Sequence, residues 1–125
     1  MNKGEELLRF FFSLRDTLKL YHWQTRSYAR HKATDKLLKR LEPAIDAFVE
    51  SYAGRYGRQD YGGAGFALKI PELDDEVASE RLRRYADFLR EELPKALAPS
   101  DTDLLTLRDE MLSALNEALY LYELR

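Results

Sequence analysis

Residues 22–50 have the sequence HWQTRSYARHKATDKLLKRLEPAIDAFVE, which contains one turn and most of a long helix. Polar residues 25–27 interrupt the helical spacing of apolar side chains. After them, apolar side chains recur every three or four residues, which predicts a helix over about residues 28–55. Pro43 lies inside this run, and we expect it to kink the helix rather than end it, because the apolar spacing resumes at once. The apolar face of this helix contains Leu37, Leu38, Leu41, Ile45, Phe48, Val49 and Tyr52.

Three further helices are predicted around this stretch. Apolar spacing predicts a helix over about residues 3–24, ahead of the turn. A third helix follows Asp74 and Asp75, which offer an N-cap, and Pro99 closes it. Ser100, with an acidic residue three positions later, resembles a capping box for the fourth helix. The buried positions expected in the third and fourth helices are Val77, Leu82, Tyr85, Leu89, Leu93, Leu104, Leu107, Met111, Leu115, Ala118 and Tyr122.

A glycine-rich connection over about residues 57–73 joins the second helix to the third. Fully extended, a link of this length reaches roughly 50 Å, whereas the second helix is roughly 40 Å long. The link can therefore cross the whole bundle. The predicted fold class is all-α, a four-helix bundle with the long crossover of ferritin-like proteins, although a simple up-down bundle could also carry a long loop.

Composition limits the classes of function. A chain of 125 residues suits one domain, residues 1–125, and the absence of cysteine excludes disulfides, thiolate metal sites and cysteine nucleophiles. A net charge of -2 provides no global attraction to nucleic acid or anionic lipid. The first residues lack the pattern of a signal peptide, and no segment has the length of a membrane span. We therefore expect a cytoplasmic protein.

Histidines and carboxylates at helical spacing form the candidate site. His22 and His31 are the only histidines, and a short antiparallel turn would bring them close together. Asp35 follows His31 by four residues, so both side chains lie on one helix face. Asp46 and Glu50 repeat the spacing of four. Such pairs also occur on solvated helix faces, so each pair by itself is weak evidence.

The two pairs lie roughly 22 Å apart along the second helix, too far for one chain to place both around one metal ion. A second copy of the helix could run antiparallel across a twofold axis near Arg40 and Leu41. The pair His31 and Asp35 of one copy would then lie opposite the pair Asp46 and Glu50 of the other. This geometry predicts two identical sites per homodimer. Imidazole and carboxylate ligands without sulfur favour iron, with manganese or zinc as competitors.

These residues resemble the signature of the Dps family, DNA-binding proteins from starved cells within the ferritin-like superfamily. His22 and Trp23 match its histidine-tryptophan pair, and the two four-residue pairs follow at the family's spacing. The resemblance implies a ferroxidase site shared between subunits, where peroxide or oxygen oxidises ferrous iron, and a hollow dodecamer that stores the ferric mineral. It also implies that one subunit supplies the first three of the metal ligands His22, His31, Asp35, Asp46 and Glu50, and its mate the last two.

The chain departs from that family in three ways. His31 follows His22 by nine positions, where the family's spacing is about twelve. The chain is also short, and a compact ferritin-like family of phage and viral genomes fits this form equally well. The N-terminus has a single lysine, Lys3, in place of a lysine-rich DNA-binding tail, so DNA binding is not carried over.

Two other interpretations stay open. The chain could be a non-enzymatic helical assembly, viral or cellular, that keeps only a vestigial metal site. A DNA-compacting protein would need a basic groove, but we expect the cluster of Lys36, Lys39 and Arg40 to be solvated and to form ion pairs. Trp23 is expected to anchor either the core or a dimer interface.

Overall fold

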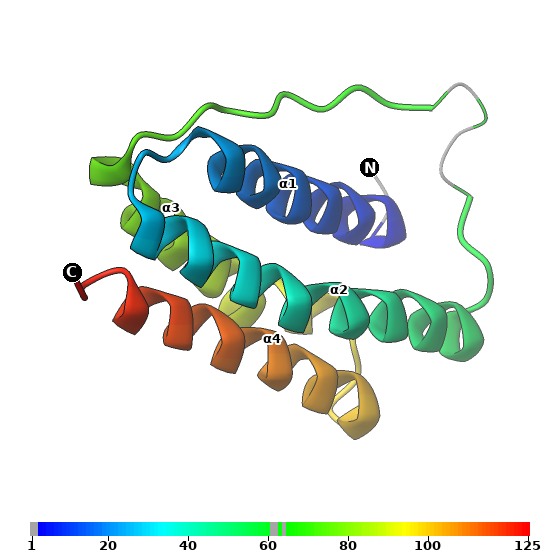
Figure 1. Ribbon diagram of the computed structural model, residues 1–125. Coiled ribbons are helices and arrows are strands. Elements are labelled where there is room, and N and C mark those ends of the chain that lie inside the picture. The colour runs from blue at the N-terminus through cyan, green and yellow to red at the C-terminus, as the bar shows by residue number, and fades with distance from the viewer. Residues whose placement is uncertain (1–2, 61–62, 64) are drawn as a thin grey trace.

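The computed structural model describes residues 3–60, 63 and 65–125. Its helices are α1 (Lys3–Gln24), α2 (Tyr28–Tyr56), α3 (Asp75–Asp87) and α4 (Thr102–Leu121). A π turn, η1 (Phe88–Glu92), and a 3-10 turn, η2 (Leu93–Ala96), continue α3. No strand occurs in these residues, so the predicted all-α four-helix bundle is confirmed (Figure 1).

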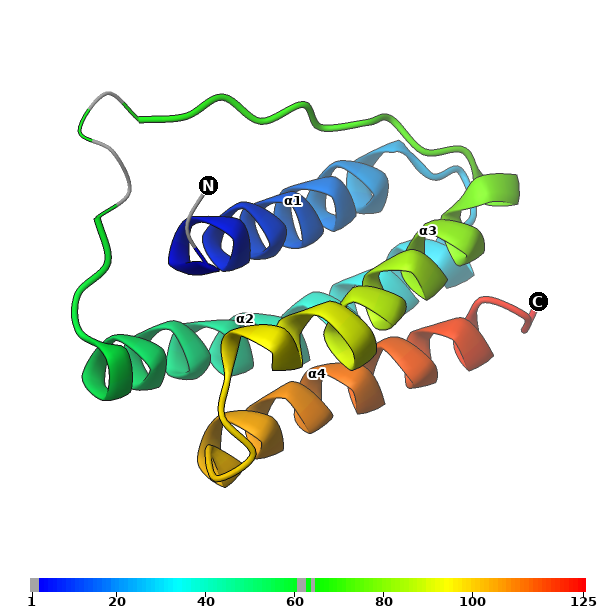
Figure 2. The same cartoon turned by 180° about the vertical axis from the view of Figure 1, so that it is seen from behind.

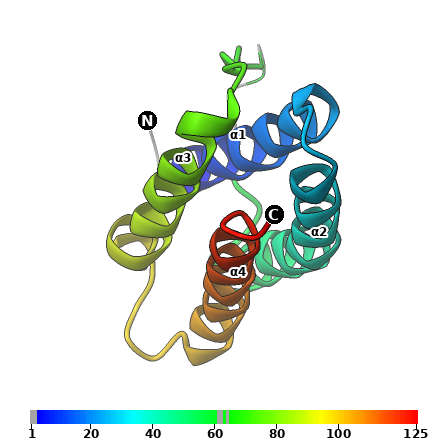
Figure 3. The ribbon, with the colours of Figure 1, turned by 60° about the vertical axis from the view of Figure 1, so that its left-hand side comes forward.

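The long connection crosses the molecule as predicted. α1 and α2 form an antiparallel hairpin, and the chain after α2 runs back along α1 to reach α3 (Figures 1 and 2). Residues 61, 62 and 64 of the predicted crossover lie outside the described residues. Seen nearer its end, the bundle has α2 and α3 on opposite sides, with α1 and α4 between them (Figure 3). No helix among the described residues has the length and apolarity needed to cross a membrane.

Apolar side chains from all four helices form the core. α2 packs mainly against α4 and α1, and it stays one continuous helix through Pro43, as predicted. Phe11 and Phe48 meet edge to face with ring centroids 5.3 Å apart, and Phe10 stacks on Phe88 at 3.9 Å. Four expected core positions differ. Val77 is exposed, and Ile45, Val49 and Leu107 are only partly buried at the edge of the core.

The caps of α3 and α4 show one success and one error of prediction. Asp74 is the N-cap of α3 and accepts a hydrogen bond from the backbone nitrogen of Val77 at 3.0 Å. The capping box predicted at Ser100 is wrong, because Asp101 occupies the N-cap position of α4. The Asp101 side chain turns away from α4 and accepts hydrogen bonds from the Tyr56 hydroxyl and the Ala98 backbone nitrogen. A tertiary contact therefore replaces the local motif.

The π turn in η1 follows from Pro94. The backbone nitrogen of Leu93 donates to Phe88, five residues back, so it does not reach the carbonyl of Leu89. Pro94 has no N–H to take its place. Arg108 on α4 fills the vacancy, since its Nη1 donates to that carbonyl at 3.0 Å.

Replacing Arg108 with Met is expected to lower the free energy of unfolding by about 1–3 kcal/mol, because a buried carbonyl loses its donor. Urea denaturation would measure the loss, with Arg83→Met on an exposed position of α3 as the control. The loss should shrink in a Pro94→Ala background, where residue 94 supplies an N–H. Equal losses in both backgrounds would contradict the role assigned to Pro94.

The contacts of Asp101 also predict a pH dependence. The hydrogen bond from Tyr56 lowers the pKa of Asp101, so the folded state favours the ionised carboxylate. The resulting stability is present above the usual Asp pKa of about 3.9 and is lost as the pH falls through the lowered value. Asp101→Asn should therefore destabilise the protein at pH 7, with a smaller effect at pH 3. Denaturation of wild type, Asp101→Asn and the exposed control Asp87→Asn at both pH values would test this, and an Asp101→Asn effect that did not shrink would contradict it.

Candidate functional site

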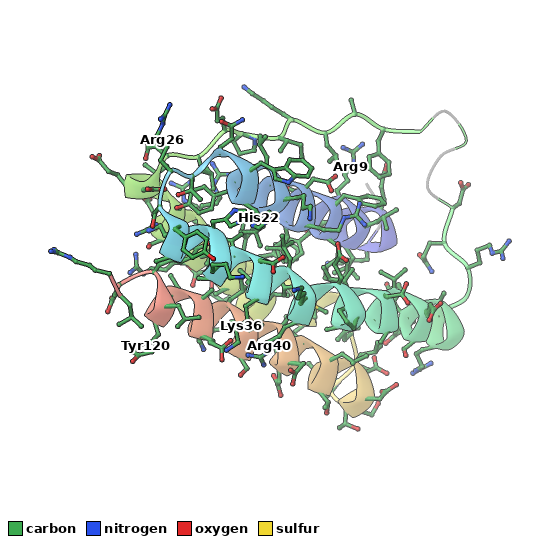
Figure 4. The ribbon with its side chains drawn as sticks, in the orientation of Figure 1. Arg9, His22, Arg26, Lys36, Arg40 and Tyr120 are labelled. Carbon is green, nitrogen blue, oxygen red and sulfur yellow. The ribbon has the colours of Figure 1, made fainter. Side chains whose placement is uncertain are left out.

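The turn between α1 and α2 brings the two histidines together, as predicted. α1 ends at Gln24, and Ser27 caps α2 by accepting a hydrogen bond from the backbone nitrogen of Arg30 at 3.2 Å. Only three residues separate the helices, so His22 in the last turn of α1 faces His31 in the first turns of α2. Figure 4 shows His22 between the two helices.

The two imidazoles bond reciprocally to each other's backbone. Nδ1 of His22 lies 3.0 Å from the carbonyl oxygen of His31, and Nδ1 of His31 lies 2.8 Å from that of His22. Because a carbonyl only accepts, both Nδ1 atoms carry a proton in the neutral rings. Among the described residues, no hydrogen bond reaches either Nε2. Each ring therefore offers a free Nε2 lone pair, the arrangement found in metal-binding histidines, whose other nitrogen is held by a carbonyl or carboxylate.

The two rings are also stacked, with centroids 4.0 Å apart and planes 13° apart. A metal ion binds an imidazole nitrogen in the plane of the ring. One ion cannot lie in two nearly parallel planes separated by such a distance. Any metal ion bound by the pair in this geometry would therefore be held by one ring alone.

Asp35 lies one helical turn beyond His31 and is held by Lys39. The Lys39 ammonium is 3.0 Å from Oδ2 of Asp35, and the Lys39 side chain is 76% exposed. The hydrogen bond from Lys39 lowers the pKa of Asp35, and a protonated His22 adds to this effect. Asp35 is therefore an ionised carboxylate close to the histidine pair, with an exposed cation as its partner.

Asp46 and Glu50 lie further along α2 and are exposed to solvent. Asp46 lines a groove of about 650 Å³ between α1 and α2. Lys39 and Glu42 line the same groove, with Arg15 on the side of α1. The structure thus places Asp46 on the same outward face as Lys39.

The five predicted ligands fall into two groups in the single chain. His22 and His31 are in contact, with Asp35 one turn away, whereas Asp46 lies roughly 16 Å along the helix from Asp35. In the described part of the chain, no three histidine or carboxylate side chains are close enough to hold one metal ion. The single chain therefore does not bring the five predicted ligands together around one ion.

Trp23 is not a core residue. Its side chain is 66% exposed, and the Lys19 ammonium lies 5.4 Å from its ring centroid. The core alternative predicted for Trp23 is therefore wrong, and the interface alternative stays a prediction. The predicted ion pairing of the basic cluster is confirmed, since Lys36 lies 3.4 Å from Glu117 and Arg40 lies 2.9 Å from Glu110. Figure 4 shows both cations between α2 and α4.

Sequence reasoning missed the groove itself. Ile45 and Val49 line it and stay partly exposed, although the apolar spacing assigned both to the core. The width of the apolar stripe on α2 was the available signal. The other helices of one chain do not cover an apolar stripe of that width, so its uncovered edge forms one wall of the groove.

Comparisons with known proteins place the chain among proteins without an assigned function. The model of a family described as "Family of unknown function (DUF5856)" matches residues 22–122, a span that contains all five predicted ligands. A protein of Enterobacteria phage T4, described as "Uncharacterized 14.6 kDa protein in mobD-ri intergenic region", is 30% identical over 103 residues, which are 82% of this chain and 80% of that protein. No solved structure matches the chain.

The hydrogen bonds of the histidine pair predict an unusual tautomer. In their neutral form both rings should carry the proton on Nδ1, whereas free neutral histidine favours Nε2. Long-range proton–nitrogen NMR correlations distinguish the two forms. His22→Phe removes one ring and one of the two bonds, so His31 in that variant is the internal control and should shift toward the Nε2 form. A proton on Nε2 of either ring in the wild type would contradict the assignment.

Proposed function

We propose that this protein, which belongs to the DUF5856 family of unknown function, binds ferrous iron between two copies of itself and oxidises it. The proposal rests on the resemblance of residues 22–50 to the Dps signature and on the geometry of the histidine pair. Iron is the substrate of the reaction, and the site is the boundary between two copies of α2. Manganese and zinc would compete for the same ligands.

The observation that supports this proposal most strongly is the state of the two imidazoles. Their Nδ1 atoms are engaged with carbonyl oxygens, and their Nε2 atoms have no partner among the described residues. Here each ring is fixed by its neighbour's backbone in the tautomer that a metal ligand needs.

Carboxylates would complete the coordination. Asp35 is ionised and adjacent to the histidines in the same chain. An antiparallel second copy would add its Asp46 and Glu50, which the single chain leaves exposed. Oxygen ligands stabilise ferric more than ferrous iron because they are hard and negatively charged, so this ligand set favours oxidation.

Two ions side by side suit the electron balance of the reaction. Each ferrous ion loses one electron, and one hydrogen peroxide molecule accepts two electrons and two protons to give two water molecules. The stacked rings, 4.0 Å apart, would hold one ion each. A site that holds a pair of ions can therefore complete the reduction without releasing a one-electron oxygen product.

An anaerobic titration with ferrous iron tests the proposal. Wild type should bind iron stoichiometrically and oxidise it when peroxide is added. Asp46→Ala with Glu50→Ala should bind at least about tenfold more weakly, since losing even supporting groups of a metal site costs that much. The matched control is Glu80→Ala on α3 with Glu91→Ala on η1, which removes two exposed carboxylates away from the groove.

Failure of the folded wild type to bind iron would contradict the proposal. Binding that survives loss of Asp46 and Glu50 would place the metal elsewhere. Binding without oxidation would favour the alternative, a helical assembly with a vestigial metal site.

A further inference from the structure

Four charged residues form a single strip along α2. Asp35, Lys39, Glu42 and Asp46 follow one another at spacings of four, three and four residues. At about 100° of rotation per residue, all four lie within roughly 60° around the helix. The last three line the groove between α1 and α2, and Asp35 is bonded to Lys39. The strip therefore faces outward beside the groove.

The groove beside this strip has an apolar wall. Leu8 and Phe12 of α1 and Ile45 and Val49 of α2 line it, and each is only partly buried. Association with a second copy of the chain would cover these apolar side chains. The charges along the strip indicate how that second copy is oriented. Along the strip the charges are acidic, basic, acidic and acidic. The centre of this strip lies between positions 40 and 41, which is also the midpoint between His31 and Glu50.

A second copy of the chain fits this pattern when its α2 runs antiparallel about that midpoint. Lys39 and Glu42 are equally far from the midpoint, so Lys39 of each copy lies opposite Glu42 of the other. Asp35 and Asp46 are also equally far from it, so at each end of the strip two carboxylates face each other. Opposite charges therefore meet at the centre, and like charges meet at both ends.

We infer that Lys39 changes partner when two copies associate, leaving Asp35 of its own chain for Glu42 of the second copy. The existing Lys39–Asp35 pair is weak, because it is an exposed pair within one helix. In the dimer Lys39 forms a less exposed pair that fixes the register of the two helices. This part of the inference depends only on the strip and the groove.

The second part rests on the proposed function. Once Lys39 no longer pairs with Asp35, Asp35 lies opposite Asp46 of the second copy with no cation between the two carboxylates. A divalent ion at this position removes the repulsion, so metal binding and dimerisation strengthen each other by equal factors. Lys39 thus keeps Asp35 neutralised in the single chain and frees it when the second copy completes the site.

Charge exchange at the centre of the strip tests the pairing. Sedimentation equilibrium in metal-free buffer should show that Lys39→Glu or Glu42→Lys alone weakens the wild-type dimer at least about tenfold, because each puts like charges opposite each other at two symmetric positions. The variant that combines both substitutions should return to within about threefold of the wild type. Lys36→Glu is the matched control, since Lys36 pairs with Glu117 of its own chain and should leave the dimer unchanged.

A combined variant that associates no better than the single variants, while each retains the helical circular dichroism of the wild type, would overturn the inference. A wild-type protein that stays monomeric would also overturn it.

Manganese separates the two parts, because it is a divalent probe that peroxide-free buffer does not oxidise. Added Mn²⁺ should tighten the wild-type dimer at least about tenfold and should not tighten that of Asp35→Asn with Asp46→Asn. Rescue by the charge exchange without a manganese effect would support the pairing and contradict the shared metal site. Iron binding and oxidation without rescue would support the proposed function and overturn the pairing.

Discussion

The guanidinium of Arg30 is the contact on which the arrangement at one end of the bundle depends, because it joins all four helices. Its Nη1 donates to the Tyr21 hydroxyl on α1 at 3.1 Å and to the Asp75 carbonyl on α3 at 2.9 Å. Its Nη2 donates at 3.2 Å to the carbonyl of Tyr122 after α4. Arg30 directly precedes His31, so the network that closes the bundle also fixes the start of α2 where the histidine pair forms. The position of the candidate site is therefore a consequence of how the bundle is closed.

Asp75 extends this network to the end of the crossover. Its Oδ1 accepts hydrogen bonds from the Tyr21 hydroxyl at 2.6 Å and from the Thr25 hydroxyl at 2.8 Å. The bond from Tyr21 lowers the pKa of Asp75, so the carboxylate stays ionised near Arg30. Thr25 lies in the turn between α1 and α2, and Asp75 begins α3. One ionised side chain thus fixes the far end of a long, glycine-rich connection against the turn that carries the histidines.

Features determined by local spacing could be predicted from the sequence, and features determined by side-chain direction could not. The limits of α1 and α2 depend on apolar spacing and on a polar turn, so the sequence alone also predicted that His22 lies close to His31. Their stacking and reciprocal bonds depend on ring rotation, which spacing does not determine. The cap of α4 was predicted wrongly because Asp101 is drawn to Tyr56, a residue far away in sequence. The donor to the Leu89 carbonyl that the π turn leaves free is Arg108, another partner far away in sequence.

A site divided between two copies also separates folding from metal binding. Buried carboxylates need partners, because an unpaired buried charge is strongly destabilising. In the single chain Asp46 and Glu50 are exposed, and Asp35 is neutralised by Lys39, so none of them opposes folding. A metal site enclosed within one chain would leave these charges buried whenever the metal was absent, and the fold would then depend on the ion. Divided as proposed, the carboxylates are brought together only when a second folded copy is present.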